Sequence, residues 1–484
     1  MKKFYIALVG ILFVCIGAVG QTTFTYQGIK YGINSKGEAY VADNPNVSGN
    51  ITIPGTVYNG DKSYSVMEIG NEAFECNQNL KSISIGGYVR KIGGGAFFEC
   101  KALTKVTMSD YMQEIGPEAF AYCSALTDIK LPGSINTIGA YAFSDCVSLE
   151  SIKIPLYLND IKEFTFDGCR SLKTVNTEEA AFLKSIGENA FNGCSSLYDL
   201  TLPETVTRIG DQALGNCSSL DRFDIPESVA SIGKSAFLNC TALSSIVIPS
   251  KISVVDDNTF SGCTSLTSAT LPETMYAIGS KAFSGCSKLS SIDMPKSMDY
   301  LQPMAFMNCS SLSSVTIPSG IEEISNNAFS GCISLTTVTL PESVTTIGQA
   351  AFSDCKLTAI EFPESLTNIG SNAFSSCDWL ETVTCTSYIP PVMESFNAFS
   401  NAAYDNATLI VPDEAYYDYL QSYGWDMFEN TKSAAIEDVF AETTTVADIF
   451  NLQGIIIKRN ASKEDLHSLP TGIYIVNGKK IVVK

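Results

Sequence analysis

Cysteine is the residue type in this sequence with the clearest potential for chemistry. There are 16 cysteines, and a thiol can serve as a nucleophile, a metal ligand or one half of a disulfide. Fourteen of them recur at intervals close to 23 residues. They are Cys76, Cys100, Cys123, Cys146, Cys169, Cys194, Cys217, Cys240, Cys263, Cys286, Cys309, Cys332, Cys355 and Cys377. Such a spacing indicates that cysteine belongs to a repeating unit, and the unit decides what its sulfur can do.

Histidine and the acidic clusters add little further chemistry. His467 is the only histidine, which excludes His-based triads and most catalytic zinc sites. The pairs Asp256-Asp257 and Glu178-Glu179 suggest glycosidase carboxylates or a calcium loop, but they are isolated and lack EF-hand spacing, which favours exposed turns. We therefore predict no enzyme activity, no metal site and no cofactor.

The repeating unit is represented by "IGENAFNGCSSLYDLTLPETVTR", residues 186–208. Leu197, Leu200 and Leu202 have the spacing of a leucine-rich repeat strand, whose alternate side chains turn inward. Pro203 ends the strand because it cannot donate to a ladder, and "ETVTRIG" carries the chain round. The segment "IGENAFNGC" lacks helix-length periodicity, so we expect short helical or 3₁₀ structure in it.

One such unit buries too little apolar surface to fold alone, so the units must stack. The sequence predicts an α/β-type leucine-rich repeat solenoid: short parallel strands stacked on one side, and turns with short helical or 3₁₀ segments on the other. Stacked cysteines then form a column. Rungs about 4.8 Å apart hold parallel side chains too far apart for an unstrained disulfide, and one column offers no convergent metal ligands. We predict buried, inert free thiols.

With the unit laid out, the sequence resembles the BspA-like (Treponema-type) leucine-rich repeat proteins of bacterial surfaces. The segment "LPESVTTIGQAAFSDC", residues 340–355, is similar to the repeat unit of these proteins, and the resemblance covers about residues 66–430. It implies a leucine-rich repeat solenoid, no catalytic activity, and a role in adhesion or host-protein binding. It implies no particular ligand, because the matching residues are structural.

The sequence divides into five segments. Residues 1–20 resemble a signal peptide: Lys2 and Lys3 precede an apolar run that is short for a spanning helix, with cleavage near Gly20 and Gln21. Residues 21–65 are expected to form an N-terminal β cap or irregular first rung, and residues 66–411 a solenoid of about 14 rungs. Residues 412–435 are expected to form a capping helix segment with Asp413 as its N-cap, and residues 436–484 a small β domain.

The last segment contains "GIYIVNGKKIVVK", in which two apolar strands flank Asn477-Gly478, a strong hairpin signal. It resembles the C-terminal sorting domains of those Bacteroidota proteins that the type IX system exports. The alternative is a tail that only ends the fold. Together with the signal peptide, this resemblance predicts a secreted protein or one on the outer cell surface.

The formal net charge of −20 disfavours nucleic acid and anionic lipid as partners. No segment after the signal peptide is long and apolar enough to span a membrane. We predict a monomer that binds an extracellular protein or glycan. The alternative is a structural spacer or surface-layer component without a specific ligand.

The outward side of each predicted strand is the candidate binding face, since its residues vary while the inward ones do not. It is rich in hydroxyl groups and poor in aromatic residues, which suits many weak hydrogen bonds along an extended partner. Threonine also favours strands for purely structural reasons, and that alternative stays open. The candidate ligand-binding residues are Thr107, Lys130, Lys153, Asn176, Thr201, Asp224, Thr270, Asp293, Thr316, Thr339, Glu361 and Thr384.

Overall fold

The computed structural model describes residues 23–434, 447–451, 455–461, 465, 468–470, 472–476 and 479–483. The predicted signal peptide with Cys15, the single histidine His467 and the predicted turn residues Asn477-Gly478 lie outside the described residues. The chain divides into two compact units, residues 1–158 and 159–484.

The first unit begins with an antiparallel meander of β1 (Thr23–Tyr26), β2 (Ile29–Ile33) and β3 (Ala39–Val41). β3 pairs in parallel with β6 (Lys62–Ile69), which also forms an antiparallel hairpin with β5 (Thr56–Asn59). The meander therefore lies against the edge of the first rung and covers backbone groups that would otherwise be an open sheet edge.

Each following rung of the first unit contributes one strand to each of two parallel sheets. The first sheet contains β4 (Gly49–Ile53), β7 (Leu80–Ile85), β9 (Lys105–Thr107) and β11 (Asp128–Ile129), and β13 (Ser151–Lys153) follows. The second sheet contains β6, β8 (Lys91–Ile92), β10 (Glu114–Ile115) and β12 (Thr137–Ile138).

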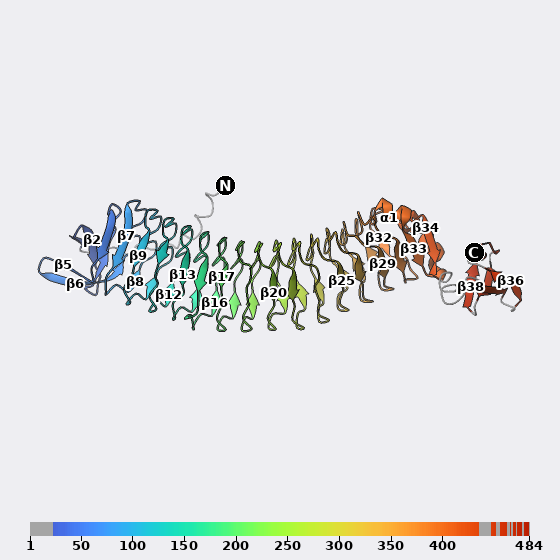
Figure 1. Cartoon of the computed structure of the whole chain (residues 1–484), viewed down its shortest axis with the longest axis horizontal. Helices are drawn as coiled ribbons and strands as arrows, with labels where there is room; N and C mark the ends of the chain where they lie inside the picture. Colours follow the sequence, from blue (N-terminus) through green and yellow to red (C-terminus); the bar gives the residue numbers. More distant parts are fainter. Residues whose placement is uncertain are drawn as a thin grey trace. The chain divides into compact units, whose positions relative to one another are not determined.

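The second unit repeats this arrangement, with successive coils stacked side by side (Figure 1). Its first-sheet strands are β15 (Thr174–Asn176), β17 (Asp199–Leu200), β20 (Ser245–Val247), β22 (Ser268–Thr270), β25 (Ser314–Thr316), β27 (Thr337–Thr339), β29 (Ala359–Phe362), β31 (Thr382–Cys385), β33 (Thr408–Val411) and β34 (Asn430–Ser433). Its second-sheet strands are β14 (Asp160–Ile161), β16 (Ser185–Ile186), β18 (Arg208–Ile209), β19 (Ser231–Ile232), β21 (Val254–Val255), β23 (Ala277–Ile278), β24 (Tyr300–Leu301), β26 (Glu323–Ile324), β28 (Thr346–Ile347), β30 (Asn368–Ile369) and β32 (Val392–Met393).

The leucine-rich repeat solenoid predicted from the sequence is confirmed, but it has a second sheet where the sequence suggested only a connecting turn. In "TVTRIG" the outward Arg208 and inward Ile209 form β18, which pairs in parallel with β16 and β19. Two residues are too short a run for period-2 alternation to be recognised in one rung. The strand exists because the same two residues recur in the next coil and complete its hydrogen bonds.

The third wall of each coil is a ladder of turns, and the expected helical or 3₁₀ segments there are wrong. Between Gly187 and Cys194, Asn189 and Gly193 have left-handed φ values of 53° and 74°. A residue in this conformation every fourth position interrupts any helix. The N–H groups of Asn189, Phe191 and Gly193 instead donate to the next rung at 2.8 Å each, while the residues between them close turns within their own rung. We call this segment of each rung the turn wall.

The core is built of columns of identical side chains. Phe283, Phe306, Phe329 and Phe352 are fully buried, and their rings stack nearly parallel with centroids 5.4–5.5 Å apart. Leu214 takes the phenylalanine position in one rung and is equally buried. Each rung thus buries both of its faces against its neighbours, as a solenoid requires.

Short helices follow the last rungs of the second unit: α1 (Asn401–Asn406), η1 (Asp413–Ala415), α2 (Tyr416–Gln421) and η2 (Trp425–Met427). The predicted role of Asp413 as helix N-cap is wrong, since Asp413 lies inside η1, and its carboxylate accepts a hydrogen bond from Ser433 Oγ at 2.7 Å. Trp425 and Tyr419 are fully buried against the final rungs.

The C-terminal segment contains a four-stranded antiparallel sheet in the order β36-β35-β37-β38. Its strands are β35 (Ala447–Asn451), β36 (Ile456–Ala461), β37 (Gly472–Val476) and β38 (Lys479–Val483). The predicted strand pair corresponds to β37 and β38, in which Val476 pairs with Lys479.

Candidate functional site

The cysteines of the second unit form a buried column behind the turn wall. The thiols of Cys263, Cys286 and Cys309 each donate to a phenylalanine carbonyl of the preceding rung at 3.2 Å. The thiol is therefore a small apolar group with one weak hydrogen bond, placed where a larger side chain would not fit. All cysteines from Cys100 to Cys385 are buried and free.

Burial also removes the reactivity of these thiols. It raises the pKa of Cys100, Cys263 and Cys332 to about 12, because a thiolate loses its hydration in an apolar environment. A thiol that stays protonated at neutral pH is a poor nucleophile and a poor metal ligand. Within the described residues, no three His, Cys, Asp or Glu side chains are arranged to hold a metal ion.

Cys76 does not belong to this column, although the spacing assigned it there. It is exposed, with a left-handed φ of 55°. The buried position three residues after the phenylalanine is Asn77 in this rung and Cys100 in the next. The Asn77 amide donates to the carbonyl oxygens of Val47 and Asn44 at 2.7 and 3.3 Å. The first rung needs a polar group here to satisfy the irregular backbone before it, and Cys76 is displaced outward by one residue.

The predicted binding face lies on the outward side of the first sheet. Val247 pairs in register with Thr270, Thr316 with Thr339, and Glu361 with Thr384. All twelve candidate residues are exposed except Thr384, which is half-buried. Lys130 and Thr201 lie one residue beyond their short strands, so expecting them at strand positions was wrong by one residue.

Asp224 and Asp293 are exposed but lie in segments that form no strand, so their expected strand positions are wrong as well. Beside Asp224, Phe223 replaces the smaller inward residue of neighbouring rungs, Leu200 and Ile246, and its ring packs on Phe237 with centroids 5.2 Å apart. A bulkier inward side chain in an interior packed to crystal density displaces the strand that carries it.

The hydroxyl groups of the face belong to two different classes. In the row nearer the cysteines, Ser244 Oγ donates to Asp221 O at 3.0 Å and Thr267 Oγ1 donates to Ser244 O at 2.9 Å. Such hydroxyls extend the ladder between rungs and are structural. In the candidate row, the hydroxyls of Thr316 and Thr339 form no hydrogen bond within the described part of the chain and point to solvent. They can bond to a partner without breaking the fold.

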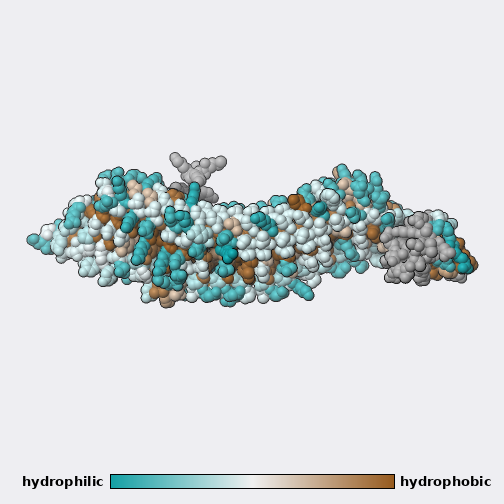
Figure 2. All heavy atoms as spheres, in the orientation of Figure 1, coloured by the Kyte–Doolittle hydropathy of each residue, from teal (hydrophilic) through white to brown (hydrophobic). Residues whose placement is uncertain are grey.

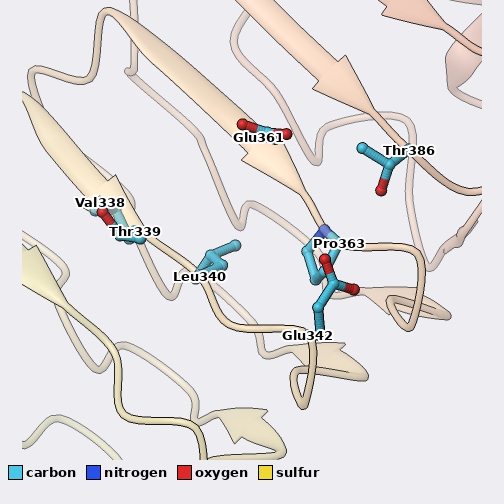
Figure 3. A pocket seen from close by; sticks show the side chains of 7 residues that line it. All are labelled: Val338, Thr339, Leu340, Glu342, Glu361, Pro363 and Thr386. Carbon is cyan, nitrogen blue, oxygen red and sulfur yellow. The ribbon is translucent and has the colours of Figure 1, made fainter.

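Two candidate residues, Thr339 and Glu361, line a hollow of about 260 Å³ in the second unit (Figure 3). The other lining residues are Val338, Leu340, Glu342, Pro363 and Thr386. The hollow lies where β27 and β29 are adjacent but not paired, because the first sheet ends at β27 and resumes at β29. The Cys355 rung is one residue shorter than its neighbours, which shifts the chain before β29 and opens the ladder.

The chemistry of this hollow is acidic and hydrogen-bonding. Figure 3 shows Glu361 and Glu342 projecting from neighbouring coils, with Pro363 between them. Neither carboxylate forms an ion pair with any described residue. Glu342 was not predicted as a site residue, because the sequence gives no sign that the turn after one strand approaches the next strand.

A second hollow of about 370 Å³ on the same face is lined by Asn176, Thr201, Glu178 and Asp199, among others. Asn176 and Thr201 were predicted from the sequence as candidate residues, and the fold brings them together from adjacent rungs. Thr177 donates its hydroxyl to the carbonyl oxygen of Thr201. Both hollows are thus lined mainly by carboxylates, amides and hydroxyls.

Exposed aromatic residues lie at positions other than those of the twelve candidate residues. Tyr198, Tyr300 and Trp379 are each more than half exposed, and the ammonium group of Lys356 lies 4.9 Å from the Trp379 ring centroid. In the view of Figure 2, hydrophobic residues form separate patches among polar ones. The sequence did contain the signal: these aromatics stand at positions that are polar in most other repeats.

Comparison with known proteins identifies the repeat. The BspA type leucine-rich repeat region matches residues 67–197, 184–313 and 301–414. The chain belongs to the BspA type leucine-rich repeat family. The matched residues contain every first-sheet strand from β7 to β31, and all twelve candidate residues lie within the matched range.

Solved structures of this kind include a leucine-rich repeat protein from Bacteroides ovatus ATCC 8483, which is 27% identical, with a TM-score of 0.62 over 85% of this chain and 98% of that chain. A leucine rich cell surface protein from Faecalibacterium prausnitzii A2-165 is also 27% identical over 76% of this chain and 95% of that chain, with a TM-score of 0.47. No curated protein matches the sequence. Among the described residues of this BspA-type chain, no helix is long and apolar enough to cross a membrane.

Proposed function

We propose that this BspA-type protein is a non-enzymatic binding protein of the cell exterior, and that it recognises an extracellular protein through the outward face of the first sheet. The observation that carries the proposal is the hollow lined by Thr339, Glu342 and Glu361, whose side chains form no hydrogen bond or ion pair with any described residue. Its volume is below the usual range of small-molecule sites. A shallow polar hollow within a long exposed face suits side chains of a protein partner.

A second function, that of a structural spacer, is favoured by a row of hydroxyl groups that form hydrogen bonds within the fold. Ser218, Thr241 and Thr264 each donate to the preceding rung, so much of the Ser and Thr content is explained without a ligand. The two functions differ in what they require of Glu342, Glu361 and Thr339. A spacer needs none of these three side chains, whereas a binding face needs at least some of them.

The test compares the wild-type chain with a Glu342→Gln, Glu361→Gln variant on an array of purified extracellular-matrix proteins and mucins. The change removes two charges with almost no change of shape, so folding should be unaffected. We expect binding to the recognised protein to weaken about tenfold, since each lost charge-assisted hydrogen bond contributes about 1.5–3 kcal/mol and solvent exposure reduces that contribution.

The matched control is the variant Glu163→Gln, Glu188→Gln, which removes two exposed carboxylates from the turn wall. It should bind as the wild-type chain does. Equal binding by all three proteins would argue against this hollow as the site. An absence of binding by the wild-type chain to every protein on the array would favour the spacer.

The cell exterior is the second part of the proposal. It is supported by the predicted signal peptide at residues 1–20 and by the family. The sorting role of residues 436–484 is supported by their resemblance to type IX sorting domains and by a sheet of four antiparallel strands. Deleting residues 436–484 should move the protein from the cell surface to the periplasm, as measured by protease accessibility on intact cells. An unchanged distribution would contradict the sorting role.

A further inference from the structure

The second sheet of the second unit is interrupted between β19 and β21 and again between β24 and β26. At the second interruption, strands β21, β23 and β24 form one parallel run, and β26, β28, β30 and β32 form the next. In the regular part, Gly348 N donates to Ile324 O at 2.7 Å, and Gly279 N donates to Val255 O at the same distance. At the interruption Ser325 replaces this glycine, and its side-chain hydroxyl takes the bond to Leu301 O at 2.7 Å. A side chain has therefore replaced a backbone group in the ladder.

Ser325 takes a position at which regular rungs pack closely. A Cβ atom added at Gly348 would lie 2.8 Å from the backbone nitrogen of Asn326, closer than real Cβ contacts allow. A Cβ here does not by itself open the ladder, since Gln302 carries one and its N–H still donates to Ile278 O at 3.0 Å.

A second replacement occurs in the same rung. In neighbouring rungs a serine two residues after the proline donates to the preceding coil, as Ser297 Oγ does to Met275 O and Ser343 Oγ to Ile321 O, at 2.6 and 2.7 Å. The corresponding residue here is Gly320. A Cβ at Gly320 would lie 2.4 Å from Asp299 Oδ1. The missing side chain therefore leaves room that the Asp299 carboxylate occupies.

The two replacements border a hollow of about 760 Å³. Its lining includes the exposed carboxylates of Asp299, Glu322 and Glu323 and the ring of Tyr300. The Tyr300 ring packs edge-on against Tyr276 of the preceding rung, with centroids 5.7 Å apart. The described residues that line the hollow include no lysine and no arginine.

A carboxylate at the position of Glu323 has a cation from the chain in another rung: Glu114 stands there, and the ammonium group of Lys91 in the preceding rung lies 3.3 Å away. Asp257, at a different position of its rung, has Lys234 at 2.8 Å. Asp299, Glu322 and Glu323 form no ion pair with any described residue. Tyr300 stands in its rung at the position that Lys91 has in an earlier rung, so an aromatic ring replaces the ammonium group here.

We propose that this hollow, which we call the acid–tyrosine hollow, binds a basic segment of a partner protein, with a lysine or arginine side chain placed between the three carboxylates and the Tyr300 ring. The carboxylates accept hydrogen bonds from the cationic group, and the ring face attracts it through its quadrupole. The volume exceeds that of one side chain, so neighbouring residues of an extended segment enter as well. The hollow lies on the second sheet, so the proposal does not depend on the first-sheet face.

The test measures fluorescence anisotropy of a labelled nine-residue peptide that alternates arginine and serine, titrated with the full chain at low salt. The variant Asp299→Asn, Glu322→Gln, Glu323→Gln should bind at least tenfold more weakly than the wild-type chain. Tyr300→Ser should weaken binding about two- to fivefold, as expected for an exposed cation–π contact. A peptide with glutamine in place of arginine should not bind.

The matched control removes three exposed carboxylates elsewhere in the second unit: Glu204→Gln, Asp221→Asn, Glu414→Gln. It has the same net charge as the hollow variant and should bind the arginine peptide as the wild-type chain does. An equal loss in both variants would show attraction by overall charge and overturn the proposal, as would unchanged binding by the hollow variant. A labelled neutral oligosaccharide that binds the wild-type chain and the hollow variant equally, but not Tyr300→Ser, would identify a glycan site instead.

Discussion

Replacing Phe329 by alanine tests whether stacking of identical side chains holds the coils of the second unit together. Phe329 is fully buried, and its ring lies 5.5 Å from that of Phe306 and 5.4 Å from that of Phe352, nearly parallel to both. Truncation of a buried phenylalanine costs about 3–5 kcal/mol. The two ring contacts account for about 1–3 kcal/mol of this, and lost burial and the remaining cavity account for the rest.

The free energy of unfolding, measured by urea denaturation with circular dichroism, should fall by that amount. Phe329→Leu is the matched control, because Leu214 fills the same position in its own rung with no exposure. It should cost less than about 1.5 kcal/mol, since it conserves most of the volume. Equal losses for alanine and leucine would refute the argument that the ring column stabilises the coils.

Three further predictions follow from the turn wall and the cysteine column. Among Cys76 and the later cysteines, only Cys76 should react promptly with a thiol reagent in the native protein. The substitution Cys76→Ser should abolish this fast phase of the reaction. A fast phase that persists in the variant would show that the reagent reaches the buried cysteine column. Burial raises the pKa of Cys100 and Cys332 from about 9 to about 12. The stability contributed by the neutral thiols is therefore present below pH 9 and lost as the pH rises toward 12. A midpoint of urea unfolding that is unchanged between pH 8 and 11 would contradict this. Gly348→Ala should destabilise the protein by about 2 kcal/mol or more, because the new Cβ would meet the backbone of the preceding rung; a melting temperature equal to that of the wild type would contradict the close packing.

The sequence predicted the repeat, the inward leucines and the buried thiols, because each is repeated many times at one spacing. It did not predict the second sheet, since a pair such as Arg208 and Ile209 carries no periodicity of its own. The prediction of helical or 3₁₀ segments in the turn wall was wrong for a related reason. The alternation of bonds within and between rungs at Asn189, Phe191 and Gly193 requires a neighbouring coil, which a single unit does not display.

The residues of the candidate sites were likewise predicted only in part. Thr339 and Glu361 were recognised from the sequence because they are variable positions on the outward side of a strand. Glu342 was not, because it reaches the hollow from the turn of another rung. Ser325 and Gly320 were readable as departures from the repeat, but their consequence depends on how closely two backbones pack.

The sequence by itself determined that this chain stacks identical units into a leucine-rich repeat solenoid, because period and side-chain type fix which residues are buried in every coil. It also determined that the column cysteines, from Cys100 to Cys377, are structural, since a single column has no convergent partner. Only the tertiary structure decided where the regular ladders open, for example between β27 and β29 and between β24 and β26. These openings arise from contacts between coils about 23 residues apart, and sequence order gives no distance between such residues.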